Sequence, residues 1–77
     1  MTGKEFDAIR KRRGLSVVQL GLLLGYQGNT NTISRTVRGY QNRGDDPVPE
    51  HIGRLVALVD QHWQSVPREW LFQAGVL

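Results

Sequence analysis

The amino-acid sequence predicts an all-α protein, a compact five-helix bundle. Three observations predict it: apolar residues recur at helical spacing, two segments open with a capping box, and no segment shows the alternation of a strand. A chain of 77 residues builds one small core. We therefore expect a single domain over residues 1–77.

The first helix is predicted over residues 3–13. Thr2 and Glu5 have the spacing of a capping box, in which each side chain bonds the backbone of the other residue. Gly14 follows the basic end of this segment and can adopt the positive φ that closes a helix.

The second helix is predicted over residues 17–24. Ser16 and Gln19 repeat the capping-box spacing, and Gly25 closes the segment. Gly21 lies inside this helix, where it is less favourable than alanine by up to about 1 kcal/mol. We therefore expect another helix to press closely against the second helix at Gly21.

The third helix is predicted over residues 32–42. Residues 26–31 mix Gly and Asn and form a turn, after which Ile33, Val37 and Tyr40 recur on one face of a helix. Two short helices joined by a turn, with a small residue midway through the first, are the pattern of a helix-turn-helix.

Two further helices are predicted in the second half of the chain. Pro49 fits the first position of the fourth helix, and Pro67 begins the short fifth helix. The fifth helix carries Trp70, Leu71 and Ala74. The fourth helix has an apolar face made of Ile52, Leu55, Val56, Val59 and Trp63.

The segment Leu15-Ser16-Val17-Val18-Gln19-Leu20-Gly21-Leu22-Leu23-Leu24-Gly25 resembles the second-helix region of Cro and lambda-repressor-like (XRE-type) regulators. The resemblance covers about residues 3–60. Compact phage and prophage members of that family also contain segments similar to Gly25-Tyr26-Gln27-Gly28, to Arg35-Thr36-Val37-Arg38 with Tyr40, and to Pro47-Val48-Pro49. The resemblance implies a lambda-repressor-like DNA-binding domain that acts as a transcriptional regulator.

The third helix carries the residues expected to read DNA bases. Its exposed face is basic and amide-rich, and Arg can bond guanine O6 and N7 while Asn can bond adenine N6 and N7. An ordinary solvated helix surface with Asn31 as N-cap is the alternative interpretation. The expected base contacts are Asn31, Arg35, Arg38 and Asn42, flanked by Thr32 and Ser34.

Phosphate contacts are expected around this face, because residues 1–44 carry a net charge of +6 while residues 45–77 carry −3. The residue that opens the second helix often touches phosphate in the resembling family. In this chain it is Val17, so only its backbone N–H could do so. The other candidates are Arg10, Arg13 and Arg43.

Residues 66–77 form a candidate dimerisation segment, because one short helix cannot bury all of their apolar surface. A homodimer would read two half-sites about 34 Å apart on an inverted repeat of double-stranded DNA. We therefore expect a repressor that occupies a palindromic operator. The candidate interface residues are Trp63, Trp70, Leu71, Phe72, Val76 and Leu77.

Two other functions are open at this point. The apolar C-terminal segment could cover a protein partner, as in an antitoxin or inhibitor. An RNA-binding protein ranks lower, because the chain lacks an obvious exposed aromatic platform for base stacking. We expect no enzyme, no cofactor and no metal site, since the chain has no Cys and no catalytic or nucleotide-binding motif.

The chain has no long apolar run and no signal-peptide pattern. We therefore expect no membrane association. The resemblance implies the cytoplasm of a bacterial cell or of a phage-infected host.

Overall fold

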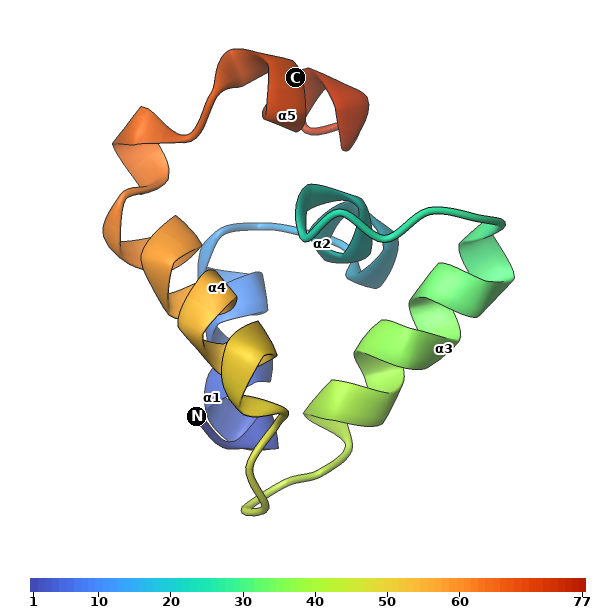
Figure 1. The fold of residues 1–77 in the computed structure, drawn as a ribbon, viewed down its shortest axis with the longest axis vertical. Coiled ribbons are helices and arrows are strands. Elements are labelled where there is room, and N and C mark those ends of the chain that lie inside the picture. The colour runs from blue at the N-terminus through green and yellow to red at the C-terminus, as the bar shows by residue number, and fades with distance from the viewer.

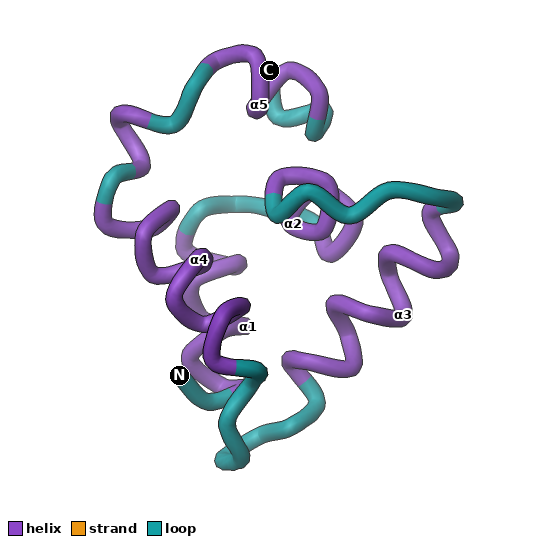
Figure 2. The backbone as a smooth tube through the Cα atoms, viewed as in Figure 1, coloured by secondary structure: helices purple, strands orange, loops and turns teal.

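The protein is all-helical, as predicted. The computed structural model describes all 77 residues and contains no strand, only an isolated β-bridge between Thr2 and Pro47. The chain forms five α-helices and one short 3₁₀ helix, and Figures 1 and 2 show that short loops join them. Their bounds are α1 Gly3–Arg12, α2 Val17–Leu23, α3 Thr30–Gln41, α4 Glu50–Gln61, η1 Trp63–Ser65 and α5 Arg68–Gln73.

The two predicted capping boxes are confirmed. The Thr2 hydroxyl accepts a hydrogen bond from the Glu5 N–H at 3.2 Å, and the Glu5 carboxylate accepts one from the Thr2 N–H at 3.1 Å. Ser16 and Gln19 exchange the same pair of bonds at the start of α2. These local bonds explain why the starts of α1 and α2 can be read from the sequence.

The core lies where α1, α2, α3 and α4 meet. Figure 1 shows α1 and α4 on one side, α3 on the other, and α2 nearly end-on between them. Phe6, Leu20, Val37 and Val56 come from these four helices, and all four are at most 1% exposed. One small core therefore holds α3 against the rest of the domain.

The expected close approach at Gly21 is confirmed. A Cβ atom on Gly21 would collide with the Ile33 side chain and would lie 3.1 Å from a methyl group of Val37. In Figure 1, α3 runs across the axis of α2. Glycine therefore lets α2 and α3 pack closely where they cross.

The fourth predicted helix is corrected at its end. We expected Trp63 on its apolar face, but α4 ends at Gln61 because the backbone of His62 (φ −115°, ψ 35°) is no longer helical. Trp63 instead opens η1 and packs against the core, with the Arg13 guanidinium 5.4 Å from its ring centre. Leu55 also differs, because it is 36% exposed rather than covered.

The prolines stand one position outside the helices that they were expected to open. Pro49 and Pro67 are the N-caps of α4 and α5. Ala74 lies directly after α5 and is buried. The Gln19 amide of α2 donates a hydrogen bond to the Gly75 carbonyl at 3.0 Å, so the C-terminal segment is fastened over α2.

None of the helices combines the length and the apolar composition that a bilayer crossing requires. No group of three or more His, Asp or Glu side chains is arranged so that it could hold a metal ion.

Candidate nucleic-acid interface

The inner face of α3 anchors this helix to the domain. Ile33 is 2% exposed and Val37 is fully buried. Tyr40 continues the face and packs edge-on against Phe6 of α1, with ring centroids 5.8 Å apart. The sequence period had predicted this face, and these contacts fix which side of α3 points outward.

Tyr26 ties the turn before α3 to the helix itself. Its hydroxyl lies 2.5 Å from the hydroxyl of Tyr40. Burial, together with the hydrogen bond to Tyr40, raises the pKa of Tyr26 to about 12. Tyr26 is therefore neutral at physiological pH, and the pair fastens the turn onto α3.

The start of α3 differs from the sequence prediction. We expected the helix to begin at residue 32, but it begins at Thr30. The N-cap is Asn29, whose side-chain oxygen accepts a hydrogen bond from the Thr32 N–H at 2.9 Å. Asn31, the cap in the alternative interpretation, lies instead in the first turn of α3 with an exposed side chain.

The outer face of α3 forms a shallow polar hollow with no hydrophobic residue in its lining. We call this surface the α3 face. Five of the six predicted base contacts line it, and Thr32 lies beside it, exposed, with its carbonyl accepting a hydrogen bond from the Thr36 hydroxyl. The α3 face consists of Asn31, Ser34, Arg35, Arg38, Gly39 and Asn42.

Most of the cations of the chain are engaged in ion pairs, whereas those of α3 are not. Six of the ten Lys and Arg residues pair with a carboxylate. Arg35, Arg38, Arg43 and Arg68 do not, and α3 itself contains no acidic residue. Three of these four unpaired guanidiniums therefore lie on α3 or just after its C-cap, Asn42. The paired residues are Lys4, Arg10, Lys11, Arg12, Arg13 and Arg54.

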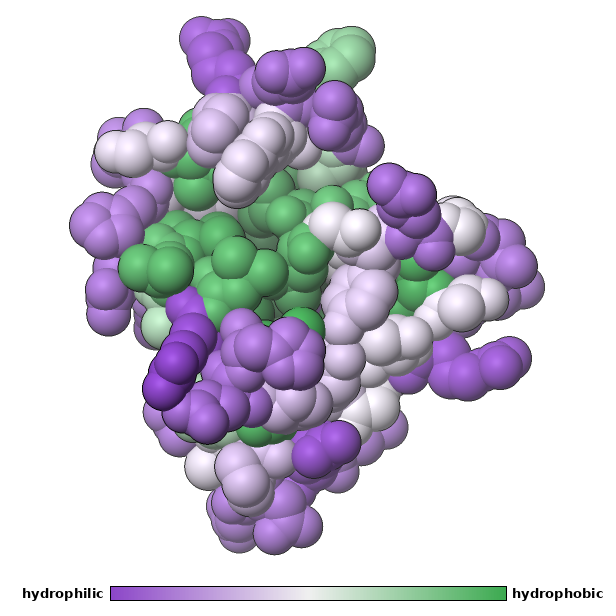
Figure 3. Space-filling model, viewed as in Figure 1, coloured by the Kyte–Doolittle hydropathy of each residue, from purple (hydrophilic) through white to green (hydrophobic).

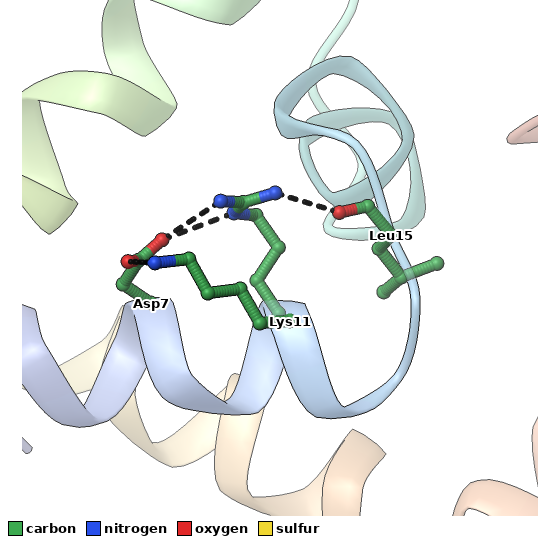
Figure 4. A network of polar contacts seen from close by, with 4 residues as sticks. Asp7, Lys11 and Leu15 are labelled. Atoms are coloured by element: carbon green, nitrogen blue, oxygen red, sulfur yellow. Dashed lines mark hydrogen bonds and ion pairs between the residues drawn. The ribbon is translucent and has the colours of Figure 1, made fainter.

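Arg10, a predicted phosphate contact, is part-buried and bonds Asp7 and Leu15 of its own domain, which are labelled in Figure 4. Its guanidinium donates to the Asp7 carboxylate at 3.0 and 3.2 Å and to the Leu15 carbonyl at 2.8 Å. Its side chain is 16% exposed. Burial raises the pKa of Asp7, but hydrogen bonds from Lys11 and Arg10 outweigh it and leave this pKa below its ordinary value. Arg10 thus joins α1 to the start of α2, and we leave it out of the proposed phosphate contacts.

Arg13, a second predicted phosphate contact, joins α1 to the end of α4. It donates to the Asp60 carboxylate at 2.8 Å and to the Asp60 carbonyl at 2.7 Å, and Arg12 bonds the same carboxylate. Burial raises the pKa of Asp60, yet the hydrogen bonds from both arginines bring this pKa below its ordinary value. Sequence spacing could not show this cluster, because Arg13 and Asp60 are 47 positions apart. We also leave Arg13 out of the proposed phosphate contacts.

The remaining phosphate candidates, Arg43 and Val17, stay predictions. Arg43 is exposed and donates one hydrogen bond to the Pro47 carbonyl at 3.0 Å. Val17 is the first residue of α2, and its side chain packs against the core.

A separate apolar surface lies over α2, α4 and α5, where Figure 3 shows a continuous hydrophobic area. Trp70 stands between two apolar hollows that both include Leu55. Of the predicted dimer residues, Trp70, Phe72 and Leu77 are 49%, 72% and 59% exposed. The other three pack against the core of their own domain, namely Trp63, Leu71 and Val76. Sequence reasoning missed Leu22 and Leu58, which the structure adds to the exposed apolar residues.

No protein-family model, no curated protein and no solved structure matches the chain. The likeness to Cro and lambda-repressor-like regulators therefore stays a prediction from the sequence.

Proposed function

We propose that the protein is a sequence-specific regulator of transcription that binds double-stranded DNA with α3 in the major groove. In this proposal α2, the turn and α3 form a helix-turn-helix. The observation that carries it is the α3 face, where Arg35 and Arg38 are unpaired although most other cations of the chain are paired.

The dimensions of α3 fit this role. A helix of 12 residues is about 18 Å long, and the major groove, about 12 Å wide, admits one α-helix. Asn31 and Arg35 lie one turn apart on the outer face, so a helix in the groove presents both to the base edges. Guanidinium and carboxamide groups are the donors and acceptors that distinguish G·C from A·T there.

The electrostatics support nucleic acid as the partner. A DNA backbone attracts guanidiniums that have no carboxylate of their own, and it would have to break an ion pair to recruit Arg10 or Arg13. Arg43 extends the unpaired positive charge beyond the end of α3. Phosphate contacts by Arg43 would position α3 without selecting bases.

A homodimer completes the proposal. One small domain offers limited interface, whereas two copies related by a two-fold axis would read an inverted repeat. Trp70, Phe72 and Leu77 are the exposed apolar side chains of the predicted dimerisation segment. Binding of the dimer would block access to the operator, so repression by occupancy is the simplest mechanism for a domain of this size.

Selection of binding sites from random duplex DNA tests this function. We expect enrichment of one sequence made of two inverted half-sites, because each protomer of the dimer would read one of them. Enrichment of a single half-site would support α3 as the reading helix and contradict the dimer. Absence of enrichment at low and at moderate salt would contradict sequence-specific binding.

A protein-binding module is the second candidate, and the apolar surface around Trp70 favours it. An antitoxin or inhibitor would cover its target with this surface, while its α3 face would be dispensable. Trp70→Ala would then abolish capture of the partner, whereas Arg35→Ala with Arg38→Ala would leave it intact. Both variants can also be tested for binding to a single DNA half-site, which does not require a dimer. Loss of this binding in Arg35→Ala/Arg38→Ala, and not in Trp70→Ala, would favour the DNA-binding proposal.

A further inference from the structure

Gly39 is the one residue of the α3 face without a side chain. It is the tenth of the 12 residues of α3, and it is exposed. It lines the polar hollow together with Arg35, Arg38 and Asn42. The two arginines and the asparagine flank a stretch of bare helix backbone.

Nothing inside the domain requires glycine at this position. Of the nine glycines in the chain, five have a positive φ, which other residues rarely adopt. At three more, as at Gly21, a Cβ would lie 3.1 Å or less from a neighbouring atom. Gly39 has neither property, because its φ is not positive and no atom lies within 4 Å of where its Cβ would be. Alanine would make the helix more stable here without any collision.

The bare backbone has a consequence for a ligand that lies on the α3 face. Without a Cβ, another molecule can come into van der Waals contact with the helix backbone itself, between side chains that carry hydrogen-bond donors. We propose that Gly39 is the point at which α3 comes closest to the sugar–phosphate backbone of bound DNA. This inference rests on the proposed function and adds a positioning residue to it.

The position of Gly39 along α3 favours the sugar–phosphate backbone over a base edge. The recognition helix of a helix-turn-helix contacts bases with its N-terminal residues, so its far end meets the wall of the groove. Gly39 lies in the last turn, next to Arg38 and three residues before Asn42. The Asn42 carboxamide is suited to donate to a phosphate oxygen beside the contact, while Asn31, Ser34, Arg35 and Arg38 face the bases.

Two substitutions separate binding from folding. Gly39→Ala adds a methyl group, which has open space in the free protein, and Gly39→Leu adds a bulkier side chain at the same exposed position. We expect Gly39→Ala to raise Tm by about 4 °C, since alanine favours the helix. We expect Gly39→Ala to weaken binding about 10-fold and Gly39→Leu about 100-fold, equally on the selected operator and on an unrelated duplex. Ala8→Leu adds bulk at an exposed position of α1, and we expect it to leave the affinity unchanged.

The outcomes distinguish this inference from the proposed function. Wild-type binding to the operator together with unchanged binding by Gly39→Leu would overturn the role of Gly39 and leave the DNA-binding proposal in place. A loss on the operator alone, with a changed base preference, would place a base edge at Gly39 and overturn the backbone contact. A wild-type protein that binds neither duplex would overturn the proposed function, and the role of Gly39 with it.

Discussion

Gly21 of α2 lies directly under the Ile33 side chain of α3, with no room for a methyl group between the two helices. Ile33 is 2% exposed, so it cannot move outward without losing its packing. This contact sets how α3 is presented, because a larger residue at position 21 would push the two backbones apart.

Gly21→Ala should therefore destabilise the protein although alanine is the better helix former. Overpacking of a core costs about 1–3 kcal/mol, and the gain in helix propensity offsets up to about 1 kcal/mol. We expect a net loss of about 1–2 kcal/mol in the free energy of unfolding, measured by urea denaturation. Gly39→Ala is the matched control, because the same change in α3 meets open space and should stabilise. Equal effects of the two substitutions would contradict the packing described at Gly21.

Asp60→Asn should reduce stability at neutral pH and should reduce it less in acid. The pKa of Asp60 is lowered in the folded protein, so its carboxylate stabilises the fold above its unfolded pKa of about 3.9. That contribution is lost as the pH falls through the lower folded pKa. Urea unfolding at pH 7 and at pH 2.5 measures the difference between wild type and variant. Asp45→Asn is the control, since the Lys4–Asp45 pair is exposed and should contribute little. A wild-type advantage over Asp60→Asn that is the same at both pH values would contradict the role given to Asp60.

Tyr26→Phe should change the alkaline stability of the protein. Because the pKa of Tyr26 is raised to about 12, the fold favours the neutral phenol. An unfolded tyrosine ionises near pH 10, so the contribution of Tyr26 is complete below that pH and is lost as the pH rises towards 12. We expect the wild type to lose more stability than Tyr26→Phe between pH 9 and pH 11.5, as followed by thermal unfolding. Parallel loss in both proteins would show that the hydroxyl pair is open in solution.

Binding to DNA should weaken steeply with salt. A dimer with Arg35, Arg38 and Arg43 free in each protomer offers six guanidiniums. If most of these charges displace counterions from the DNA, the slope of log affinity against log salt is about −5. Arg43→Ala should bring the slope about 2 closer to zero for the dimer, whereas Arg13→Ala should leave it nearly unchanged. A slope that changes with Arg13→Ala and not with Arg43→Ala would identify Arg13 as a phosphate contact.

The sequence predicted those parts of the fold that depend on local bonds. The capping boxes at Thr2 and Ser16 are made by residues three positions apart, and both are present. The start of α3 was less determined, because the turn contains two asparagines that can each cap a helix. The structure selects Asn29, so that α3 begins at Thr30 and takes Asn31 into its first turn.

Contacts between distant segments could not be predicted in this way. Arg13 was predicted to contact phosphate, and its pairing with Asp60 could not be foreseen, because Asp60 comes near it only after α1 and α4 have packed together. Helical spacing placed Leu55 on the apolar face of α4, but spacing does not tell how far neighbouring helices extend over that face. Gly39 lies within the predicted third helix, but spacing cannot show its open surroundings, because these depend on where every neighbouring segment lies.

In the proposed function, Arg35 and Arg38 read DNA from the outer face of α3. The most direct test compares the affinity of Arg35→Ala/Arg38→Ala for the selected operator with that of Arg54→Ala/Arg68→Ala, which removes two charges from α4 and α5 instead. We expect Arg35→Ala/Arg38→Ala to lower the affinity about 100-fold or more, since each bidentate contact to guanine is worth about 1–3 kcal/mol. Circular dichroism should show that the fold of this variant is unchanged. The control pair should bind within about threefold of wild type. Operator binding by the folded Arg35→Ala/Arg38→Ala variant as tight as that of the wild type would contradict DNA reading by α3.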